Sequence, residues 1–381
     1  MRVDKRKKLD LFLIVPYVVV SVIGLLMVYS ASTFRLMTFN QQTTYLLVRQ
    51  FIFVLVSWGG ICLIFKIRSS LLLHPTLVKI ILSIGIGSLM MTRIPGIGVN
   101  VSGAQRWVSL LGFQFQPAEI VNVGLILYFA YYFRKYRSVS SELKKPILIT
   151  SVCFLLILFQ PKVAGAILLL LLATVMITSI QLPVRNMIVF FLGLIGLLLI
   201  TGGVIYVLGK NGWLPRIFSH TFDRLNIASN PFLDPYGKGF QMSQSYYAIY
   251  NGGLFGLGLG NSITKKGYLP VAETDFIFSI ILEELGLIVG LFLLALLFLI
   301  ILRLFVLSMN EPNQQIGLIY LGTGTLLLIQ TSINIASISG IIPMTGMPLP
   351  FISYGGSSYL ILSMLLGICL KLSSRGSVYE N

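Results

Sequence analysis

Apolar residues fill most of the chain in long runs that polar segments separate. Crossing a hydrocarbon core of about 30 Å takes roughly 20 residues of α-helix. Ten runs approach or exceed that length: residues 11–30, 46–65, 77–92, 118–133, 147–160, 163–180, 187–208, 276–302, 315–335 and 352–372. The run at 147–160 is short enough to be a tilted or re-entrant segment instead. The pattern predicts an all-α integral membrane protein with about ten transmembrane helices, which would place both termini on one side.

The composition supports a membrane protein. Of the 381 residues, 56% are hydrophobic and only 10% are charged, and the mean hydropathy is +0.90. Soluble domains have about 25% charged residues, so the composition excludes a soluble globular domain. The three cysteines lie within apolar runs and show neither a disulfide framework nor a zinc pattern. We expect residues 1–381 to form a single polytopic membrane domain.

The basic residues predict the orientation, because short cytoplasmic loops hold an excess of Lys and Arg. Such residues gather at the N-terminus, at 66–68, in the segment 134–146 and after the last apolar run. Both termini are therefore expected in the cytoplasm, and the long polar loop at about 209–275 is expected outside. The net charge of +16 then indicates topology signals and contacts with membrane lipids, and not a nucleic-acid partner. The first apolar run has no convincing cleavage site, and we expect a retained anchor.

Elimination among the acidic residues points to Asp275. Seven of the twelve lie in predicted outer or intramembrane segments: Glu119, Asp223, Asp234, Glu273, Asp275, Glu283 and Glu284. Asp275 stands at the outer end of the eighth predicted helix, where a low dielectric raises its pKa and a helix N-terminus lowers it. The carboxylate could be a catalytic base, and a helix cap explains its position equally well.

Glu283 lies about 12 Å deeper along the same helix, where an ionisable group is a functional hypothesis by default. For Glu283 and Glu284 together, an internal ion pair or hydrogen-bonded contact between helices is the preferred explanation. The run from Gly256 to Gly260 lacks the spacing of a dinucleotide fingerprint and predicts tight turns or a close approach of the backbone to a ligand.

The long loop also supplies cations that could bind phosphate, since arginine grips phosphate oxygens with two parallel hydrogen bonds. These candidates are Arg216, Arg224, Lys238, Lys265 and Lys266, although a solvated surface position is the simpler explanation for each one alone. A pyrophosphate-bearing ligand would fit such a loop. Without a Walker-type phosphate loop in the sequence, the substrate is expected to carry its own energy.

Several motifs resemble one family. The run Pro343-Met-Thr-Gly-Met-Pro-Leu-Pro-Phe-Ile-Ser-Tyr-Gly-Gly-Ser-Ser358 resembles the signature of the bacterial shape, elongation, division and sporulation family. Further resemblance lies in Gly103-Ala-Gln-Arg-Trp107, Gln116-Pro-Ala-Glu119, 230–241, 252–260, Thr274-Asp-Phe-Ile-Phe278 and Glu283-Glu284. These motifs follow one another in the family's order and span essentially the whole chain.

The resemblance implies a ten-helix peptidoglycan glycosyltransferase. Such an enzyme polymerises lipid II on the outer face of the bacterial cytoplasmic membrane and works with a class B penicillin-binding protein. The family's essential aspartate falls on Asp275, which would take the proton of the attacking sugar hydroxyl. The motifs add Arg106, Glu119, Ser353 and Ser357 as substrate-binding candidates, with Gln241 and Glu283 in support. A cofactor stays open, with a divalent cation (Mg or Mn) as one candidate for steadying the pyrophosphate.

The chain departs from the family pattern at four positions. Asn122 stands where Lys is usual, Lys162 stands where the family has Asp, and Val271 and Glu273 replace residues of the motif before Asp275. The segment 251–263 leans toward division-type members.

Two other functions stay open: a lipid II flippase in which Asp275 couples transport to protons, and a non-catalytic scaffold that recruits the penicillin-binding protein. The lack of an obvious internal repeat and the position of the notable residues at the outer face disfavour the flippase.

Overall fold

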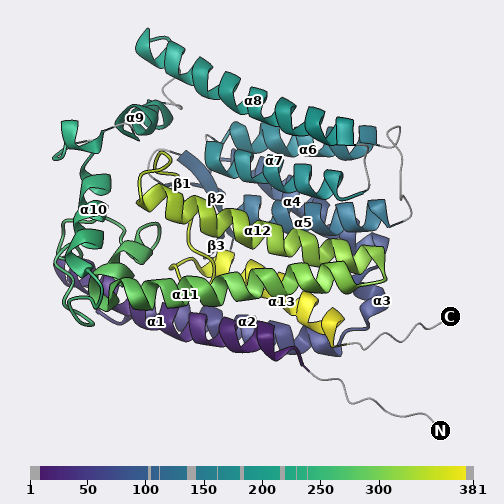
Figure 1. Ribbon diagram of the computed structural model, residues 1–381, viewed down its shortest axis with the longest axis horizontal. Coiled ribbons are helices and arrows are strands. Elements are labelled where there is room, and N and C mark those ends of the chain that lie inside the picture. The colour runs from purple at the N-terminus through teal and green to yellow at the C-terminus, as the bar shows by residue number, and fades with distance from the viewer. Residues whose placement is uncertain are drawn as a thin grey trace.

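The computed structural model describes residues 9–101, 104–110, 112–134, 143–160, 162–180, 184–214, 219–228, 230–237 and 239–374. Long helices lie side by side along most of the molecule (Figure 1). Each of the ten predicted segments corresponds to one helix. These helices are α1 (Leu11–Thr38), α2 (Tyr45–Lys66), α4 (Pro75–Met91), α5 (Pro117–Phe133), α6 (Lys144–Leu158), α7 (Val163–Thr178), α8 (Val184–Lys210), α11 (Ile277–Asn310), α12 (Gln314–Ile338) and α13 (Gly356–Ser373).

Within the described residues, five of these helices, α1, α2, α11, α12 and α13, are long and apolar enough to cross a membrane. Shorter apolar helices include α4, α5 and α7. The prediction of a helical multi-pass membrane protein is confirmed, and the number of ten crossings stays a prediction.

Local sequence signals fix several helix starts. The side chain of Asp10 accepts a hydrogen bond from the backbone N–H of Phe12 at the start of α1. Asn313 caps α12 in the same way, through the N–H groups of Gln315 and Ile316. Proline occupies the first position of both α4 and α5, where its missing N–H removes no helical bond. Each signal lies immediately before an apolar run, or at its first residue.

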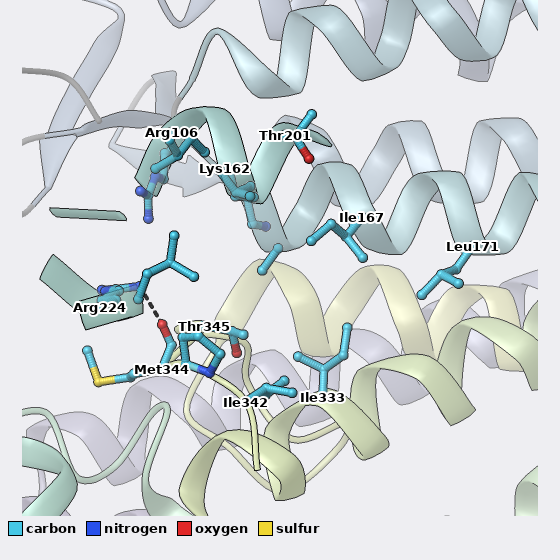
Figure 2. Close-up of a pocket in the computed structure, with 16 residues that line it drawn as sticks. Arg106, Lys162, Ile167, Leu171, Thr201, Arg224, Ile333, Ile342, Met344 and Thr345 are labelled. Carbon is cyan, nitrogen blue, oxygen red and sulfur yellow. Dashed lines mark hydrogen bonds between the residues drawn. The ribbon is translucent and has the colours of Figure 1, made fainter. Parts of the chain in front are cut away.

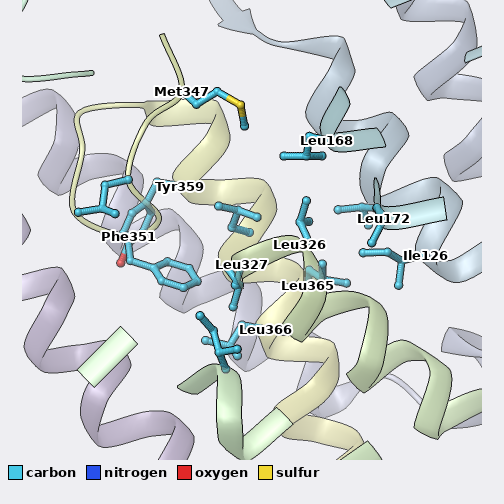
Figure 3. Packing of buried hydrophobic residues seen from close by; sticks show 14 of the residues in the cluster. Ile126, Leu168, Leu172, Leu326, Leu327, Met347, Phe351, Tyr359, Leu365 and Leu366 are labelled. Carbon is cyan, nitrogen blue, oxygen red and sulfur yellow. The ribbon is translucent and has the colours of Figure 1, made fainter. Parts of the chain in front are cut away.

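The core lies where α5, α7, α12 and α13 pack together (Figure 3). Helix α5 is apolar and buried on all sides, so it carries no solvent-facing stripe. Small residues let the helices approach closely: a Cβ on Gly322 of α12 would come within 2.8 Å of the Ile126 side chain and 2.9 Å of the Met176 sulfur. Glycine at helix contacts is typical of membrane bundles, in which van der Waals packing drives association.

One end of the bundle holds structure that apolar runs do not predict. A three-stranded antiparallel sheet, with the order β1 (Gly98–Val101), β2 (Ala104–Leu110), β3 (Phe113–Phe115), connects α4 to α5. The long loop between α8 and α11 contains α9 (Ser219–Ala228), a 3-10 turn (Pro231–Leu233) and α10 (Phe240–Gly252). The sheet, α9 and α10 lie at the end away from the first described residues of α1 and the last of α13, whereas the short helix α3 (Ser69–Leu72) lies at that other end (Figure 1).

Helix α11 is broken near its start at Gly286, whose φ of 82° and ψ of 172° are not helical. The loop after α10 satisfies the backbone groups that the break releases. The N–H of Leu257 donates to the Glu283 carbonyl and the N–H of Gly258 to the Glu284 carbonyl, both at 2.9 Å. The N–H of Leu287 donates to the Gly253 carbonyl at 3.0 Å. A Cβ at Gly256 would lie 2.3 Å from the Glu284 oxygen, so the glycine run comes close to the backbone of α11. Gly256, Gly258 and Gly260 all have positive φ, which agrees with the predicted tight turns.

Candidate active site

Asp275 lies directly before α11, where the 340–355 loop covers it. Its backbone oxygen accepts a 3.0 Å hydrogen bond from Asn334, which also donates to the Met347 carbonyl at 2.7 Å. A Cβ on Gly346, which has a φ of +68°, would be 3.3 Å from the Asp275 carboxylate. The N-cap of α11 is Phe276, and no side chain caps that helix. Asp275 is therefore not a helix cap, which removes one of the two explanations for its position.

Three cations from segments far apart in sequence act electrostatically on Asp275: Arg106 on β2, Lys162 before α7 and Arg224 on α9. Arg224 donates to the Met344 carbonyl at 3.1 Å, and Arg106 donates to the Gln160 carbonyl at 3.3 Å. Two of the sequence-predicted binding residues, Arg106 and Arg224, are thus brought to the predicted catalytic residue.

Burial governs the ionisation of this group of residues. Removal from water raises the pKa of Asp275 above its usual range, although Arg224, Thr274, Lys162 and Arg106 each act to lower it. Burial likewise lowers the pKa of Arg224, and the negative charge of Asp275 opposes that effect. A carboxylate with a raised pKa is a better proton acceptor than an ordinary surface aspartate, which suits a general base.

A cavity of about 410 Å³ opens beside the three cations. Figure 2 shows Arg106, Lys162 and Arg224 together at one end, and the apolar side chains of Ile167 and Leu171 extending away along α7. Helices α8 and α12 and the segment Ile342–Thr345 complete its wall. A cationic end followed by an apolar passage suits an amphiphile with an anionic head and a hydrocarbon tail.

The turn at Phe159 and Gln160, just before α7, is held by hydrogen bonds to its backbone and to the Gln160 side chain. Arg93 donates to the Phe159 carbonyl, as Arg106 does to that of Gln160. The Gln160 amide donates to the Leu89 carbonyl at 3.2 Å and to the Thr92 hydroxyl at 3.0 Å. These bonds tie the start of α7 to the end of α4 and to β2. The turn therefore sets where Lys162 enters the cavity.

Glu119 is buried in the first turn of α5. Its carboxylate accepts a 3.2 Å hydrogen bond from the Gln330 amide and acts electrostatically on Lys162. Glu119 therefore adjoins the cationic group without facing Asp275 directly. Lys162 lines the cavity and was not among the site candidates of the sequence analysis; its departure from the family pattern is the signal that could have identified it.

Both predicted serines lie in or next to the loop that covers Asp275. Ser353 is buried, and its hydroxyl accepts a 2.8 Å hydrogen bond from the N–H of Leu349. Ser357 is buried in the first turn of α13, and its hydroxyl has no hydrogen-bond partner among the described residues. Ser353 thus orders the loop, whereas Ser357 carries an unused hydroxyl.

The structure places the other loop candidates elsewhere. Lys265 is buried and forms an ion pair of 2.6 Å with Glu284, and it donates to the Ser30 hydroxyl at 2.9 Å. Lys266 is exposed, and Gln241 is partly buried at the start of α10. Arg216 and Lys238 lie outside the described residues.

Glu283 and Glu284 form the internal contact that the sequence analysis preferred. The Glu283 carboxylate accepts hydrogen bonds from the side chains of Asn251, Ser262 and Thr264 and from two backbone N–H groups. Together with the Lys265–Glu284 ion pair, this cluster fastens the loop after α10 to the first part of α11. Its position next to the break at Gly286 gives it a supporting role for the segment that carries Asp275.

Glu273 is likewise engaged in structure. It is buried and pairs with Arg35 of α1, and its carbonyl accepts a 2.9 Å hydrogen bond from the N–H of Tyr354. Val271 has a φ of +55°, which is strained for a β-branched residue. Thr274 closes this turn by donating to the Val271 carbonyl at 3.0 Å. The turn before Asp275 is therefore tied to α1 and to the loop before α13.

No group of three or more His, Cys, Asp or Glu residues in the described part of the chain could hold a metal ion. A Mg or Mn ion at this site would take most of its ligands from substrate phosphates and water, as Mg²⁺ commonly does in phosphate sites.

Fold and site together define a multi-pass helical membrane protein with a carboxylate and cations at one end of the bundle. A family model described as "Cell cycle protein", which takes in FtsW, RodA and SpoVE, matches residues 10–377. The chain therefore belongs to this family, the shape, elongation, division and sporulation proteins that its motifs resemble.

Individual relatives cover nearly the whole chain. A probable peptidoglycan glycosyltransferase FtsW of Enterococcus hirae is 49% identical over 371 residues, which cover 97% of this chain and 94% of the relative. Stage V sporulation protein E of Bacillus subtilis is 34% identical, with 97% and 98% covered. A chain from a solved peptidoglycan synthase complex matches with a TM-score of 0.75 at 24% identity, with 96% and 97% covered. RodA of Thermus thermophilus matches with a TM-score of 0.68 at 23% identity, with 96% of each chain covered. These two structures share the fold of this chain.

Proposed function

We propose that this protein is a peptidoglycan glycosyltransferase that polymerises lipid II into glycan strands at the outer face of the bacterial cytoplasmic membrane. The observation that carries the proposal is that Arg106 and Arg224, which act electrostatically on Asp275, also line one end of a cavity with an apolar interior. Lipid II consists of a sugar head, a pyrophosphate and a long hydrocarbon chain. These three parts match, in order, the carboxylate, the cations and the apolar part of the cavity. The names of the relatives point to the same activity.

The reaction is a single displacement. The 4-hydroxyl oxygen of the acceptor sugar forms a bond to the anomeric carbon of the donor, the bond from that carbon to the pyrophosphate oxygen breaks, and the anomeric configuration inverts. Asp275 takes the proton of the attacking hydroxyl, for which its raised pKa suits it. Arg106 and Arg224 stabilise the negative charge that develops on the departing lipid pyrophosphate.

The proposed topology puts the sheet, α9, α10 and Asp275 outside the cell and both termini in the cytoplasm. The basic residues support this orientation, since Lys66, Arg68, Lys144, Lys145 and Arg185 all flank helices at the end away from Asp275. A class B penicillin-binding protein is the proposed partner, and the match to a chain of a peptidoglycan synthase complex supports it.

The test is the reaction of the purified protein and its penicillin-binding partner with lipid II in detergent. We expect glycan polymer with the inverted linkage. If no polymer forms and the protein instead moves labelled lipid II across vesicle membranes, the function is transport. If neither activity is found and the partner alone becomes active on binding, the chain is a scaffold.

A further inference from the structure

Lys162 is a buried cation without a direct partner. The residue is 9% exposed, and its ammonium group has neither a hydrogen bond nor an ion pair within 4 Å among the described residues. Glu119 and Asp275 attract it from a longer range, whereas Arg106 repels it. Burial of an unpaired charge raises the free energy of the folded protein. An anion bound next to the Lys162 ammonium group would reduce this cost.

The start of α7 adds a second feature that favours an anion at the same place. This 16-residue helix begins at Val163, and the part of the chain that the structure describes shows no side-chain capping hydrogen bond at its N-cap, Lys162. Val163 and Ala164, its first two residues, line the cavity. Uncapped N–H groups and the positive end of the helix dipole form an anion site together, and here they adjoin a lysine.

Gly165 leaves the space that the side chain of Lys162 occupies. A Cβ at position 165 would lie 2.8 Å from the Cδ and 3.0 Å from the Cε of Lys162, so the stem of the lysine passes across the helix where only a glycine leaves room. Figure 2 shows Lys162 between Arg106 and the apolar residue Ile167. The ammonium group therefore lies where the cationic end of the cavity passes into its apolar part.

We propose that Lys162, together with the uncapped start of α7, binds the phosphate nearest the hydrocarbon chain of a polyprenyl diphosphate, a proposal that rests on the proposed function. An anion at this boundary has its hydrocarbon chain directed along Ile167 and Leu171. In this arrangement, Arg106 and Arg224 bind the phosphate nearer the sugar. Lys162 is thus a binding residue for the lipid-linked leaving group.

The experiment measures binding of polyprenyl diphosphate, polyprenyl monophosphate and polyprenol of one chain length to the purified protein in detergent. Lys162→Met is expected to weaken binding of both phosphates by about tenfold or more, since a charge-assisted hydrogen bond is lost, and to leave the alcohol unaffected. Gly165→Ala should act in the same direction without changing any charge, and Lys162→Arg should retain more affinity than Lys162→Met. The exposed Lys210, at the end of α8, supplies the matched control Lys210→Met, which should bind all three probes as the native chain does.

Three results would overturn the assignment. Unchanged phosphate binding by Lys162→Met would remove the site. Weaker binding of the diphosphate alone would place Lys162 at the other phosphate, and equal weakening of polyprenol would give the residue a merely structural role. Lipid II polymerisation by the native protein is scored separately, so that a native chain without polymer rejects the proposed function, whatever Lys162 binds.

Discussion

At the scale of single residues, the site depends on a balance between burial and charge at Asp275. Burial raises the pKa of this carboxyl group, and the nearby cations act in the opposite direction. Arg224 contributes the largest of these opposing effects and also contacts the covering loop through Met344. The same side chain therefore helps to tune the base and to order the wall of the cavity.

The pH dependence of polymerisation should report this balance. A base acts only when it is deprotonated, so the raised pKa of Asp275 predicts that activity falls on acidification at a higher pH than for an ordinary aspartate. Arg224→Met removes the strongest pKa-lowering charge and should move the acidic limb of the kcat profile to still higher pH. Lys210 is exposed and is not among the charges that shift the pKa of Asp275, so Lys210→Met should leave the acidic limb in place. A limb that moves to lower pH in Arg224→Met would contradict the electrostatic account.

The buried ion pair between Lys265 and Glu284 should make loss of the lysine strongly destabilising. Lys265→Met leaves Glu284 charged and buried without its partner, which typically costs about 3–5 kcal/mol in the free energy of unfolding. The adjacent Lys266 is exposed, so Lys266→Met should change that free energy by less than about 0.5 kcal/mol. Thermal unfolding of both variants in detergent measures the difference. Equal stability of the two variants would show that the buried pair contributes little.

The sequence could single out residues whose chemistry is unusual for their position. Asp275 is a candidate because a charge near an apolar span needs an explanation, and Arg224 is one because a loop arginine can bind phosphate. Arg106 and Glu119 are substrate-binding candidates only through the motifs that resemble the family. Lys162 was missed as a site residue because it becomes significant only when the turn before α7 meets β2 and α9. Lys265 looked like a phosphate ligand from its place in the loop, whereas the structure pairs it with Glu284.

At the scale of elements, apolar length predicted all ten long helices, because each must bury its backbone hydrogen bonds within itself. The same signal could not predict the short sheet, whose strands of 4, 7 and 3 residues are defined by pairing with one another. Nor could it predict the break in α11, where a glycine within an apolar run interrupts the helix. Both features lie at the end of the bundle that carries the site.

The break makes Gly286 a sensitive position. Alanine would be strained at its φ of 82° and ψ of 172°, by about 1–3 kcal/mol, and its Cβ would come within 2.4 Å of the Leu254 oxygen. Gly286→Ala should therefore lower the melting temperature and the polymerisation rate together, since the loop that supports Asp275 is displaced. Gly59→Ala serves as the control, because that helical glycine in α2 faces open space. A fully stable and active Gly286→Ala protein would mean that the break is not required.

At the scale of the whole molecule, connections that are distant in sequence meet at one end of the bundle. The segments after α4, before α7, after α8 and after α12 together surround the cavity, and the apolar helices behind them offer a passage for a hydrocarbon chain. In the proposed function, this arrangement keeps the hydrocarbon chain of the substrate in the bilayer while its sugars react at the aqueous face. An active site built from four connections depends on the packing of the helices that end there.

The most direct measurement of the central claim is lipid II polymerisation by Asp275→Asn beside the native protein, each with its partner and with polyprenyl diphosphate binding determined in parallel. The amide keeps the size of the side chain and removes its ability to take a proton. We expect the variant to bind the diphosphate and to form polymer at least about 100-fold more slowly, in line with the usual contribution of a general base. Polymerisation at the native rate by a folded Asp275→Asn protein would contradict the account.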